Sequence, residues 1–217
     1  MRTLASNKIT EAAVRLTVSR GMPAHWGLLP NPEAPVTVMI HAQPFAGYAT
    51  GLYDQGMRAV ISGVACNQRS PTVGIRYLSP LHYVVARREA AARGADEALM
   101  LNTAGNLACA SKANIFLVLG DTLLTPHPAS GAPPSIVRGL VLSELAPRLA
   151  LNAAEIEMRS GAFSWADEVF LTNALLRIMP LVEVVDGQSI GAGSPGPVSS
   201  SLGAELERSW TRRLEHG

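Results

Sequence analysis

The chain has 217 residues and a mass of 22.9 kDa, with 47% hydrophobic and 16% charged residues. This length fits one large domain with room for part of a second, and the apolar content excludes an intrinsically disordered chain. Eighteen basic against seventeen acidic residues leave a formal charge of +1, so we expect neither nucleic acid nor a membrane as a partner.

The sequence also restricts the compartment and the metal chemistry. No apolar run reaches the length of a bilayer span, and the N-terminus lacks the layout of a signal peptide. The two cysteines, Cys66 and Cys109, are too few for a disulfide framework and lack metal-ligand spacing. We therefore expect a cytoplasmic protein with no metal site.

The first expected elements are two strands, over residues 12–19 and 36–42, joined by a loop that is rich in proline and glycine. The following segment, residues 43–56, carries Pro44 and three glycines, which is typical of a linker. A third strand is expected over residues 57–65.

Residues 79–94 give the clearest helix pattern. Ser79 is a favourable N-cap, Pro80 suits the first helical turn, and Gly94 is a typical C-terminal residue. We expect this helix to bury its large apolar side chains: Leu81, Val84 and Val85, together with Ala92.

The remaining pattern mixes both kinds of element. We expect strands over residues 97–102, 105–111, 114–120 and 168–173, and helices over residues 136–149 and 202–214. Because strands and helices intermingle without a regular βαβ rhythm, an α+β fold is favoured over a doubly wound α/β fold.

Several strings occur in a characteristic order: EAAVRLTVSRG, VVARREAAARGADEALMLNTAGNLACASKANIFLV, TLLTPHPASGAPPSIVRGLVLSELA, WADEVFLTNAL and VVDGQSIGAGSPGPVS. Together they resemble the class IV, or fold-type IV, pyridoxal-phosphate (PLP) enzymes. These are the D-amino-acid and branched-chain aminotransferases and 4-amino-4-deoxychorismate lyase. The resemblance implies an α+β large domain, D-amino-acid aminotransferase-like, with a barrel-like β core, and a homodimer.

The same resemblance suggests how the chain is divided. EAAVRLTVSRG, which is similar to a strand near the end of the family's small α/β domain, begins a few residues after Met1. We therefore expect residues 1–45 to be a remnant of that small domain, without its phosphate-binding arginine. Residues 46–56 are then a linker, and residues 57–217 form the C-terminal large domain.

Arg76 stands where the family has its Schiff-base lysine, thirteen residues before the glutamate of the ARREA string, which is Glu89 here. A guanidinium stays protonated and offers no free amine to an aldehyde. Two roles for Arg76 remain open. It binds a carboxylate or phosphate with its planar fork, or it points to solvent or pairs with a nearby acid.

Cys109, in GNLACASKANIF, stands where the family has the glutamate under the pyridine nitrogen. A thiol supplies no fixed negative charge there unless its pKa is lowered. Cys109 is a nucleophile if Arg76 lowers that pKa; the alternative, which is the more common one, is a buried thiol that fills space.

The family's phosphate-binding turn aligns with Ser135, Ile136 and Val137. Val137 lacks the hydroxyl of the threonine found there, although backbone amides at the start of a helix still bind anions. Thr172 matches another phosphate contact of the family. These four residues are the candidates for binding a cofactor or another anion.

Two further residues are candidates for lining the pocket. His127 lies on a loop that approaches the cofactor in the family, and Lys112 lies three residues after Cys109. Strand alternation is expected to point Lys112 and Cys109 to opposite faces, so Lys112 does not replace the missing amine.

Three functional interpretations follow. The first is a diverged class IV protein without covalently bound PLP, acting as a PLP-independent enzyme on a small anionic metabolite with Arg76 and Cys109 at its centre. The second is a non-catalytic pseudoenzyme that binds a ligand or an intact homologue. The third, which requires the alignment at Arg76 to be wrong, is a genuine PLP-dependent aminotransferase or lyase.

Overall fold

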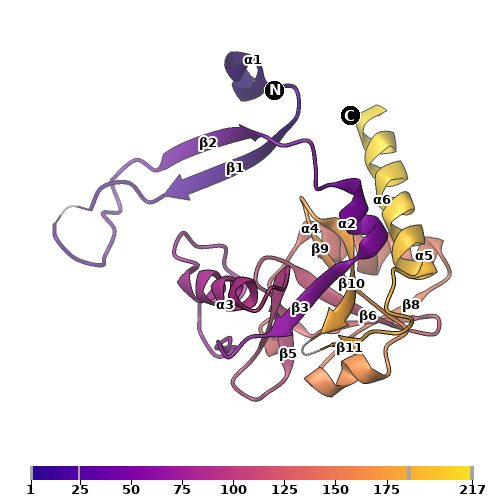
Figure 1. Ribbon diagram of the computed structural model, residues 1–217. Coiled ribbons are helices and arrows are strands. Elements are labelled where there is room, and N and C mark those ends of the chain that lie inside the picture. The colour runs from indigo at the N-terminus through magenta and orange to yellow at the C-terminus, as the bar shows by residue number, and fades with distance from the viewer. Residues whose placement is uncertain (1, 24, 185–186, 216–217) are drawn as a thin grey trace. The chain divides into compact units, whose positions relative to one another are not determined.

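The structure is a computed structural model that describes residues 2–23, 25–184 and 187–215. It divides into two compact units, Met1–Gly47 and Tyr48–Gly217, which are described separately below (Figure 1). The segment 46–56, expected to be a linker, instead contains the helix α2 (Thr50–Gln55). Leu52 and Tyr53 of α2 pack against the core of the second unit.

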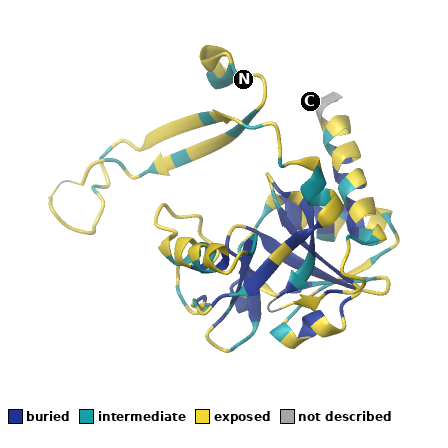
Figure 2. Cartoon of the chain, in the orientation of Figure 1, coloured by how far each residue is buried: buried dark blue, intermediate teal, exposed yellow. Residues whose placement is uncertain are grey.

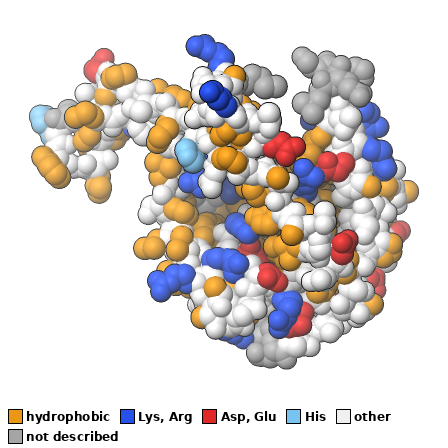
Figure 3. Space-filling view, turned by 45° about the horizontal axis from the view of Figure 1, so that its top comes forward, with side chains coloured by type: hydrophobic (Ala, Val, Ile, Leu, Met, Phe, Trp, Pro, Cys, Tyr) orange, Lys and Arg blue, Asp and Glu red, His pale blue; other side chains and the backbone are white. Residues whose placement is uncertain are grey.

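The first unit consists of a short helix, α1 (Arg2–Asn7), and a hairpin of β1 (Ala12–Ser19) and β2 (Thr37–Pro44). The strand predicted over residues 12–19 is confirmed. Leu16 pairs with Ile40 and Val18 with Val38, and directly opposed residues share one face of a hairpin. That face is apolar, and hydrophobic side chains are visible on the surface of this unit (Figure 3).

The second unit is built on one curled sheet with the strand order β5-β4-β3-β10-β9-β6-β7-β8, to which β11 adds beside β10. The sheet is mixed: β3 is parallel to β4 and to β10, and β7 is parallel to β8, whereas the other neighbouring strands are antiparallel. The strands are β3 (Met57–Ile61), β4 (Glu97–Leu101), β5 (Leu107–Ala110), β6 (Asn114–Leu119), β7 (Thr122–Pro126), β8 (Asn152–Ile156), β9 (Glu168–Asn173), β10 (Arg177–Val184) and β11 (Gln188–Ser189).

The central strands are buried on both faces, which explains their continuous apolar runs (Figure 2). Successive side chains of β6 alternate between two clusters: Ile115 lies in one, and Phe116 in the other. Phe116 stacks on Phe170 of β9 with ring centroids 5.0 Å apart.

Helices cover the sheet. They are α3 (Leu81–Ala92); α4 (Ile136–Leu140), continued by the π-helical turn η2 (Val141–Leu145) and by α5 (Ala146–Arg148); and α6 (Pro197–Glu215). Two 3-10 turns, η1 (Pro128–Ser130) and η3 (Ser160–Ser164), complete the described elements. The buried Glu168 accepts hydrogen bonds from the amides of Val198 and Ser199 at 2.8 Å. It thereby satisfies the N-terminal N–H groups of α6.

The helix α3 is shorter than predicted, and the prediction of its buried face was wrong. Ala86 and Ala90 are fully buried, whereas Leu81 is 66% exposed. The small alanines let the helix pack close to β4. Glu89 attaches α3 to the segment that follows β3. Its carboxylate accepts hydrogen bonds from the Ser62 hydroxyl at 2.6 Å and from the Gly63 amide.

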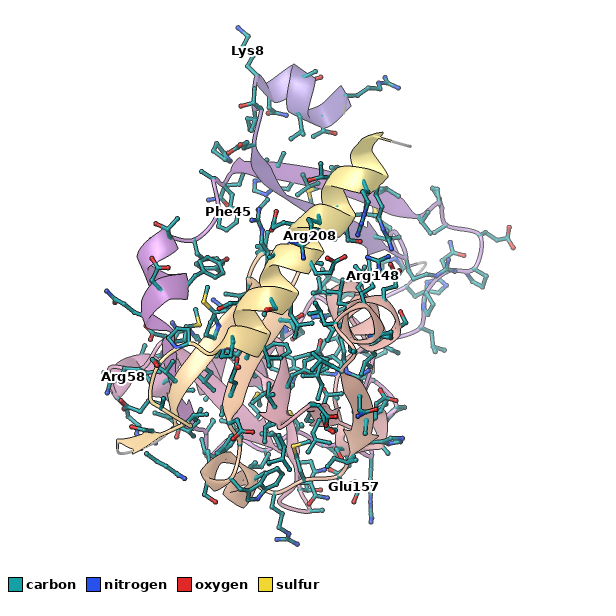
Figure 4. All side chains as sticks on the ribbon, turned by 90° about the vertical axis from the view of Figure 1, so that its right-hand side faces the viewer. Lys8, Phe45, Arg58, Arg148, Glu157 and Arg208 are labelled. Atoms are coloured by element: carbon teal, nitrogen blue, oxygen red, sulfur yellow. The ribbon has the colours of Figure 1, made fainter. Side chains whose placement is uncertain are left out.

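A cluster of charges joins α5 to α6. Glu205 accepts hydrogen bonds from Arg148 of α5 and from Arg208 and Arg212 of its own helix. Figure 4 labels Arg148 and Arg208 of this cluster. The bonds to Arg208 and Arg212 are the main reason that the pKa of Glu205 is lowered from its usual value. The cluster therefore ties α5 to α6.

Candidate functional site

The loop that leads into α4, residues 130–137, is here called the cup loop. Gly131 adopts a φ of 98°, a left-handed conformation that favours glycine. The Asn114 amide donates to the Pro133 carbonyl at 2.8 Å, and Arg76 Nη2 donates to the Pro134 carbonyl at 3.2 Å. Two side chains from other segments thus position the backbone directly before the helix.

Arg76 is therefore next to the predicted anion-binding turn. Its side chain is exposed, and the contact with Pro134 uses one of the five N–H donors of a guanidinium. Both roles considered from the sequence stay predictions: the side chain is open to solvent, and it also lies at the edge of the predicted anion-binding turn.

Ser135 precedes α4 in an extended conformation, and its side chain forms no capping hydrogen bond. Ile136 is 83% exposed, whereas Val137 is buried in the cluster that contains Phe116. The side chain of Val137 therefore belongs to the core. At this turn, the backbone amides and the Ser135 hydroxyl are the available anion donors.

Thr172 lies beside the cup loop with an unsatisfied hydroxyl. In the antiparallel pair of β6 and β9, Thr172 is directly opposite Asn114, so the two side chains share one face of the sheet. The Asn114 amide on that face reaches Pro133 of the cup loop. Thr172 is fully buried, and its Oγ1 forms no hydrogen bond with the described residues.

Few buried side-chain polar atoms of the described residues lack a hydrogen-bond partner. Besides Thr172 Oγ1 they are Glu97 Oε2, Arg138 Nε and Ser130 Oγ, the last of which is in the cup loop. An unpaired buried hydroxyl costs about 1–3 kcal/mol. Such groups in a native protein point to a strained or ligand-binding position.

Cys109 lies on the other side of the site, among the residues buried beneath α3. It is fully buried, and its Sγ is 4.0 Å from Cys66 Sγ. The hydrogen bond with Cys66, together with burial, raises the pKa of Cys109 well above the ordinary value. The same hydrogen bond lowers the pKa of Cys66.

This environment disfavours the nucleophile interpretation of Cys109. A reactive cysteine needs an accessible thiolate, whereas Cys109 keeps its proton and has no exposed surface. Arg76 does not contribute to its pKa shift. Cys109 is the buried, space-filling thiol that the sequence offered as the more common alternative.

The two other pocket candidates have local partners. Lys112 is exposed, and its Nζ lies 3.3 Å from the Tyr48 hydroxyl and 5.2 Å from the centre of that ring. It lies in the turn after β5 and not on the strand, so strand alternation does not decide its direction. His127 caps η1, because its Nδ1 accepts a hydrogen bond from the Ala129 amide.

Several residues that now define the site had no functional role assigned from the sequence. Asn114 and Ser130 lie inside the quoted family strings. The sequence alone, however, does not show that Asn114 donates to Pro133 or that the Ser130 hydroxyl has no partner among the described residues. Arg138 follows the cup loop, and its buried side chain forms an ion pair with the exposed Glu155. From the sequence, its chain neighbour Val137 was instead selected as an anion-binding candidate, and the side chain of Val137 lies in the core.

Two other kinds of feature do not occur among the described residues. No group of three or more His, Cys, Asp or Glu side chains there is arranged to hold a metal ion. Within the same residues, no helix has both the length and the apolar character needed to cross a membrane. A separate hollow of about 390 Å³, lined among others by Arg58, Arg93 and Glu183, includes none of the predicted site residues.

Comparison with known proteins identifies the family. Residues 1–184 match the amino-transferase class IV family. The chain belongs to this family. Over 161 residues it is 32% identical to a probable branched-chain-amino-acid aminotransferase of Aquifex aeolicus, covering 71% of this chain and 51% of that protein. Over 206 residues it is 29% identical to a putative branched-chain-amino-acid aminotransferase of Methanocaldococcus jannaschii, covering 93% and 68%.

Solved structures support the same assignment. The branched-chain amino acid aminotransferase of Escherichia coli superposes with a TM-score of 0.84 at 27% identity, over 93% of this chain and 66% of that one. That of the archaeon Thermoproteus uzoniensis, solved with norvaline, gives a TM-score of 0.83 at 28% identity, over 95% and 67%. These likenesses confirm the predicted α+β, class IV aminotransferase-like fold. The chain spans between about a third and two thirds of the length of the curated class IV relatives it matches first.

Proposed function

We propose that this class IV protein binds a small phosphate- or carboxylate-bearing metabolite non-covalently at the cup loop, and does not perform Schiff-base chemistry. The observation that carries the proposal is the unpaired, buried hydroxyl of Thr172 on the sheet face that carries Asn114 and the cup loop. An anion that accepts a hydrogen bond from this hydroxyl offsets the cost of leaving it unpaired.

Charge and backbone geometry support the same ligand class. The Arg76 guanidinium, held at the Pro134 carbonyl, places a permanent positive charge at the edge of the cup loop. The helical segment that starts at Ile136 continues through η2 and α5 to Arg148, and the first amides of such a segment have no partners within the helix. A hydroxyl, a guanidinium and backbone amides are together typical donors for phosphate.

PLP as a resident covalent cofactor does not fit these residues, although one solved relative carries pyridoxamine 5'-phosphate. The phosphate end of such a group has donors, but the position aligned with the family's lysine holds Arg76, which has no free amine. The position aligned with the ring-nitrogen glutamate holds Cys109, whose thiol is fully buried and hydrogen-bonded to Cys66. No chemical step of the proposed function therefore passes through PLP.

In the enzymatic form of this proposal, Arg76 binds the anionic group and stabilises negative charge that develops on it. Cys109 takes no part, because it is buried and protonated. In the pseudoenzyme form, the same contacts bind the ligand without turnover. Turnover of an anionic metabolite by the purified protein supports the first form, and co-purification with an intact class IV homologue supports the second.

We further propose that the protein self-associates through the exposed side of α3. Leu81 is 66% exposed, and Val84 and Val85 of the same helix are each nearly half exposed. The spacing of these residues forms an apolar stripe on one face of the helix, and exposed apolar patches mark interaction surfaces. Light scattering of the wild type and of a Val84→Glu, Val85→Lys double variant tests this, and a monomeric wild type would refute it.

Calorimetric titration tests the anion site, with inorganic phosphate and PLP as probes. We expect one site per chain, and at least a tenfold loss of affinity in Arg76→Ala, which corresponds to about 1.4 kcal/mol. Arg69→Ala is the matched control, since Arg69 is an exposed arginine of the preceding loop, and it should bind like the wild type. Equal affinities in the wild type and Arg76→Ala would refute the proposal.

A further inference from the structure

The first unit carries an apolar surface that neither the anion site nor the stripe on α3 uses. None of the described residues of this unit is buried (Figure 2). Its two strands, β1 and β2, pair with each other and with no other described strand. A two-stranded hairpin is only marginally stable in water unless its apolar side is packed against something. The hairpin therefore needs a cover.

Strand alternation gives the hairpin two different faces. On one face, every cross-strand pair is apolar, with Leu16 opposite Ile40 at the centre. This surface is here called the hairpin face and consists of Ala12, Val14, Leu16, Val18, Val38, Ile40, Ala42 and Pro44. The other face carries Arg15 opposite His41. An apolar face backed by a polar one is typical of a sheet that is buried on one side.

The exposed area of the hairpin face can be compared with what an interface needs. Its five large side chains are between 49% and 63% exposed: Val14, Leu16, Val18, Val38 and Ile40. With roughly 150–180 Å² of surface for a free residue of this size, they present roughly 450 Å² per copy. Together with Ala12, Ala42 and Pro44, two facing copies would bury about 1,100 Å², and a specific interface needs about 1,000 Å². The face is therefore large enough for a weak dimer.

The means of stabilising a small unit without a core narrow the choice of cover. They are disulfides, a bound metal, or oligomerisation. Residues 1–47 contain no cysteine, and no metal-binding group occurs among the residues that the structure describes. Oligomerisation is the remaining means. Pairing of strand edges would leave the hairpin face uncovered, so the contact has to be face to face.

A second copy of this chain suits the hairpin face. The face has no charged side chain, so two copies meet without like charges opposing each other. Their strands have the same length, and facing sheets pack about 10 Å apart. We propose that two copies of this chain pack their hairpin faces against each other around a two-fold axis. This surface is separate from the stripe on α3.

The test is light scattering of the full-length chain over a range of concentrations. The starting protein is the Val84→Glu, Val85→Lys variant, in which the stripe on α3 is disrupted. We expect it to form a dimer with a dissociation constant in the micromolar range, as the small interface implies. Added to this variant, Leu16→Lys should weaken the dimer at least tenfold. Thr17→Lys is the matched control, because Thr17 lies on the other face, and it should change the constant less than twofold.

Two results of this experiment would overturn the proposal. One is a starting variant that stays monomeric at every concentration, and the other is an equal effect of the two lysine substitutions. Failure of the separate α3 proposal leaves the expected result unchanged, since the starting variant already lacks that surface.

Cross-linking supplies an independent measurement in case Leu16→Lys unfolds the hairpin. Leu16→Cys and Thr17→Cys are treated with a short bismaleimide, and the wild type, whose two cysteines are buried, sets the background. We expect a cross-linked dimer for Leu16→Cys and none for Thr17→Cys. No cross-link above background for Leu16→Cys would overturn the proposal and assign the cover of the hairpin face to another protein or to another part of the same chain.

Discussion

The two sides of the candidate site satisfy their polar groups in different ways. On the anion side, Arg76 is exposed, and Thr172 keeps a buried hydroxyl without a partner among the described residues. On the thiol side, Cys66 and Cys109 are hydrogen-bonded to each other beneath α3. Unpaired donors need a ligand, whereas groups that pair among themselves do not. The proposed function accordingly assigns a ligand to the anion side and none to the thiol side.

The largest expected effect comes from restoring the family's acid on the thiol side. Cys109→Glu places a carboxylate in a fully buried position beside Glu97, which already contributes to the raised pKa of Cys109. We expect a loss of about 3–5 kcal/mol in the free energy of unfolding, as for other unpaired buried charges. Urea denaturation measures it.

Cys109→Ser is the control for this prediction, because it keeps the size of the side chain and introduces no charge. It should cost about 1 kcal/mol, within the range usual for point mutations. If Cys109→Glu is as stable as Cys109→Ser, the thiol side is open to water or to a cation, and the contrast between the two sides fails.

A smaller effect of opposite sign is expected on the anion side. Thr172→Val removes the unpaired hydroxyl while keeping the shape of the side chain, so the unliganded protein should gain about 1 kcal/mol in stability. The same variant should bind phosphate more weakly. Thermal unfolding with and without phosphate measures both changes. A destabilised Thr172→Val protein with unchanged phosphate affinity would show that the hydroxyl has a structural partner.

The smallest expected effect is a pH dependence of the packing of α3 over Cys66 and Cys109. Hydrogen bonds from Ser62 and from the Gly63 amide lower the pKa of Glu89 on α3. A carboxyl whose pKa is lowered by folding adds stability above its unfolded pKa, and this stability is lost as the pH falls through the folded pKa. Labelling of Cys66 by a thiol reagent that works in acid should therefore speed up below about pH 4.5.

Glu89→Gln provides the comparison for this experiment, because the amide does not titrate in that range. Its labelling rate should lack the acid-induced increase. An identical increase in wild type and variant would assign the opening to other carboxylates, among them Glu205, whose pKa is also lowered.

The fold was predictable from the sequence because the family strings cover the sheet and occur in a fixed order. The strands over residues 12–19 and 168–173 have the predicted bounds. The face of α3 was not predictable from hydrophobicity, since two alanines pack more closely on β4 than Leu81 would. The segment 136–149 was predicted as one helix, but the π turn over residues 141–145 interrupts its α-helical hydrogen bonding.

The site was predictable in part. Arg76 was identified as a candidate by its spacing from Glu89, and Ser135 and Thr172 by their positions in the family strings. The contact between Cys66 and Cys109 was not, because the two residues are 43 positions apart and come together only when their segments pair with β4. Likewise, the absence of a partner for Thr172 Oγ1 among the described residues depends on three-dimensional packing.

The most direct test of non-covalent binding at the cup loop uses PLP as the probe. The purified protein is incubated with PLP, its absorbance spectrum is recorded, and borohydride reduction is followed by intact-mass analysis. We expect the spectrum of unmodified PLP and no mass adduct, with Arg76→Lys as the variant in which an amine beside the cup loop should react. A reducible adduct on wild-type Lys112 or Lys8 would contradict the proposal and restore aldimine chemistry to this chain.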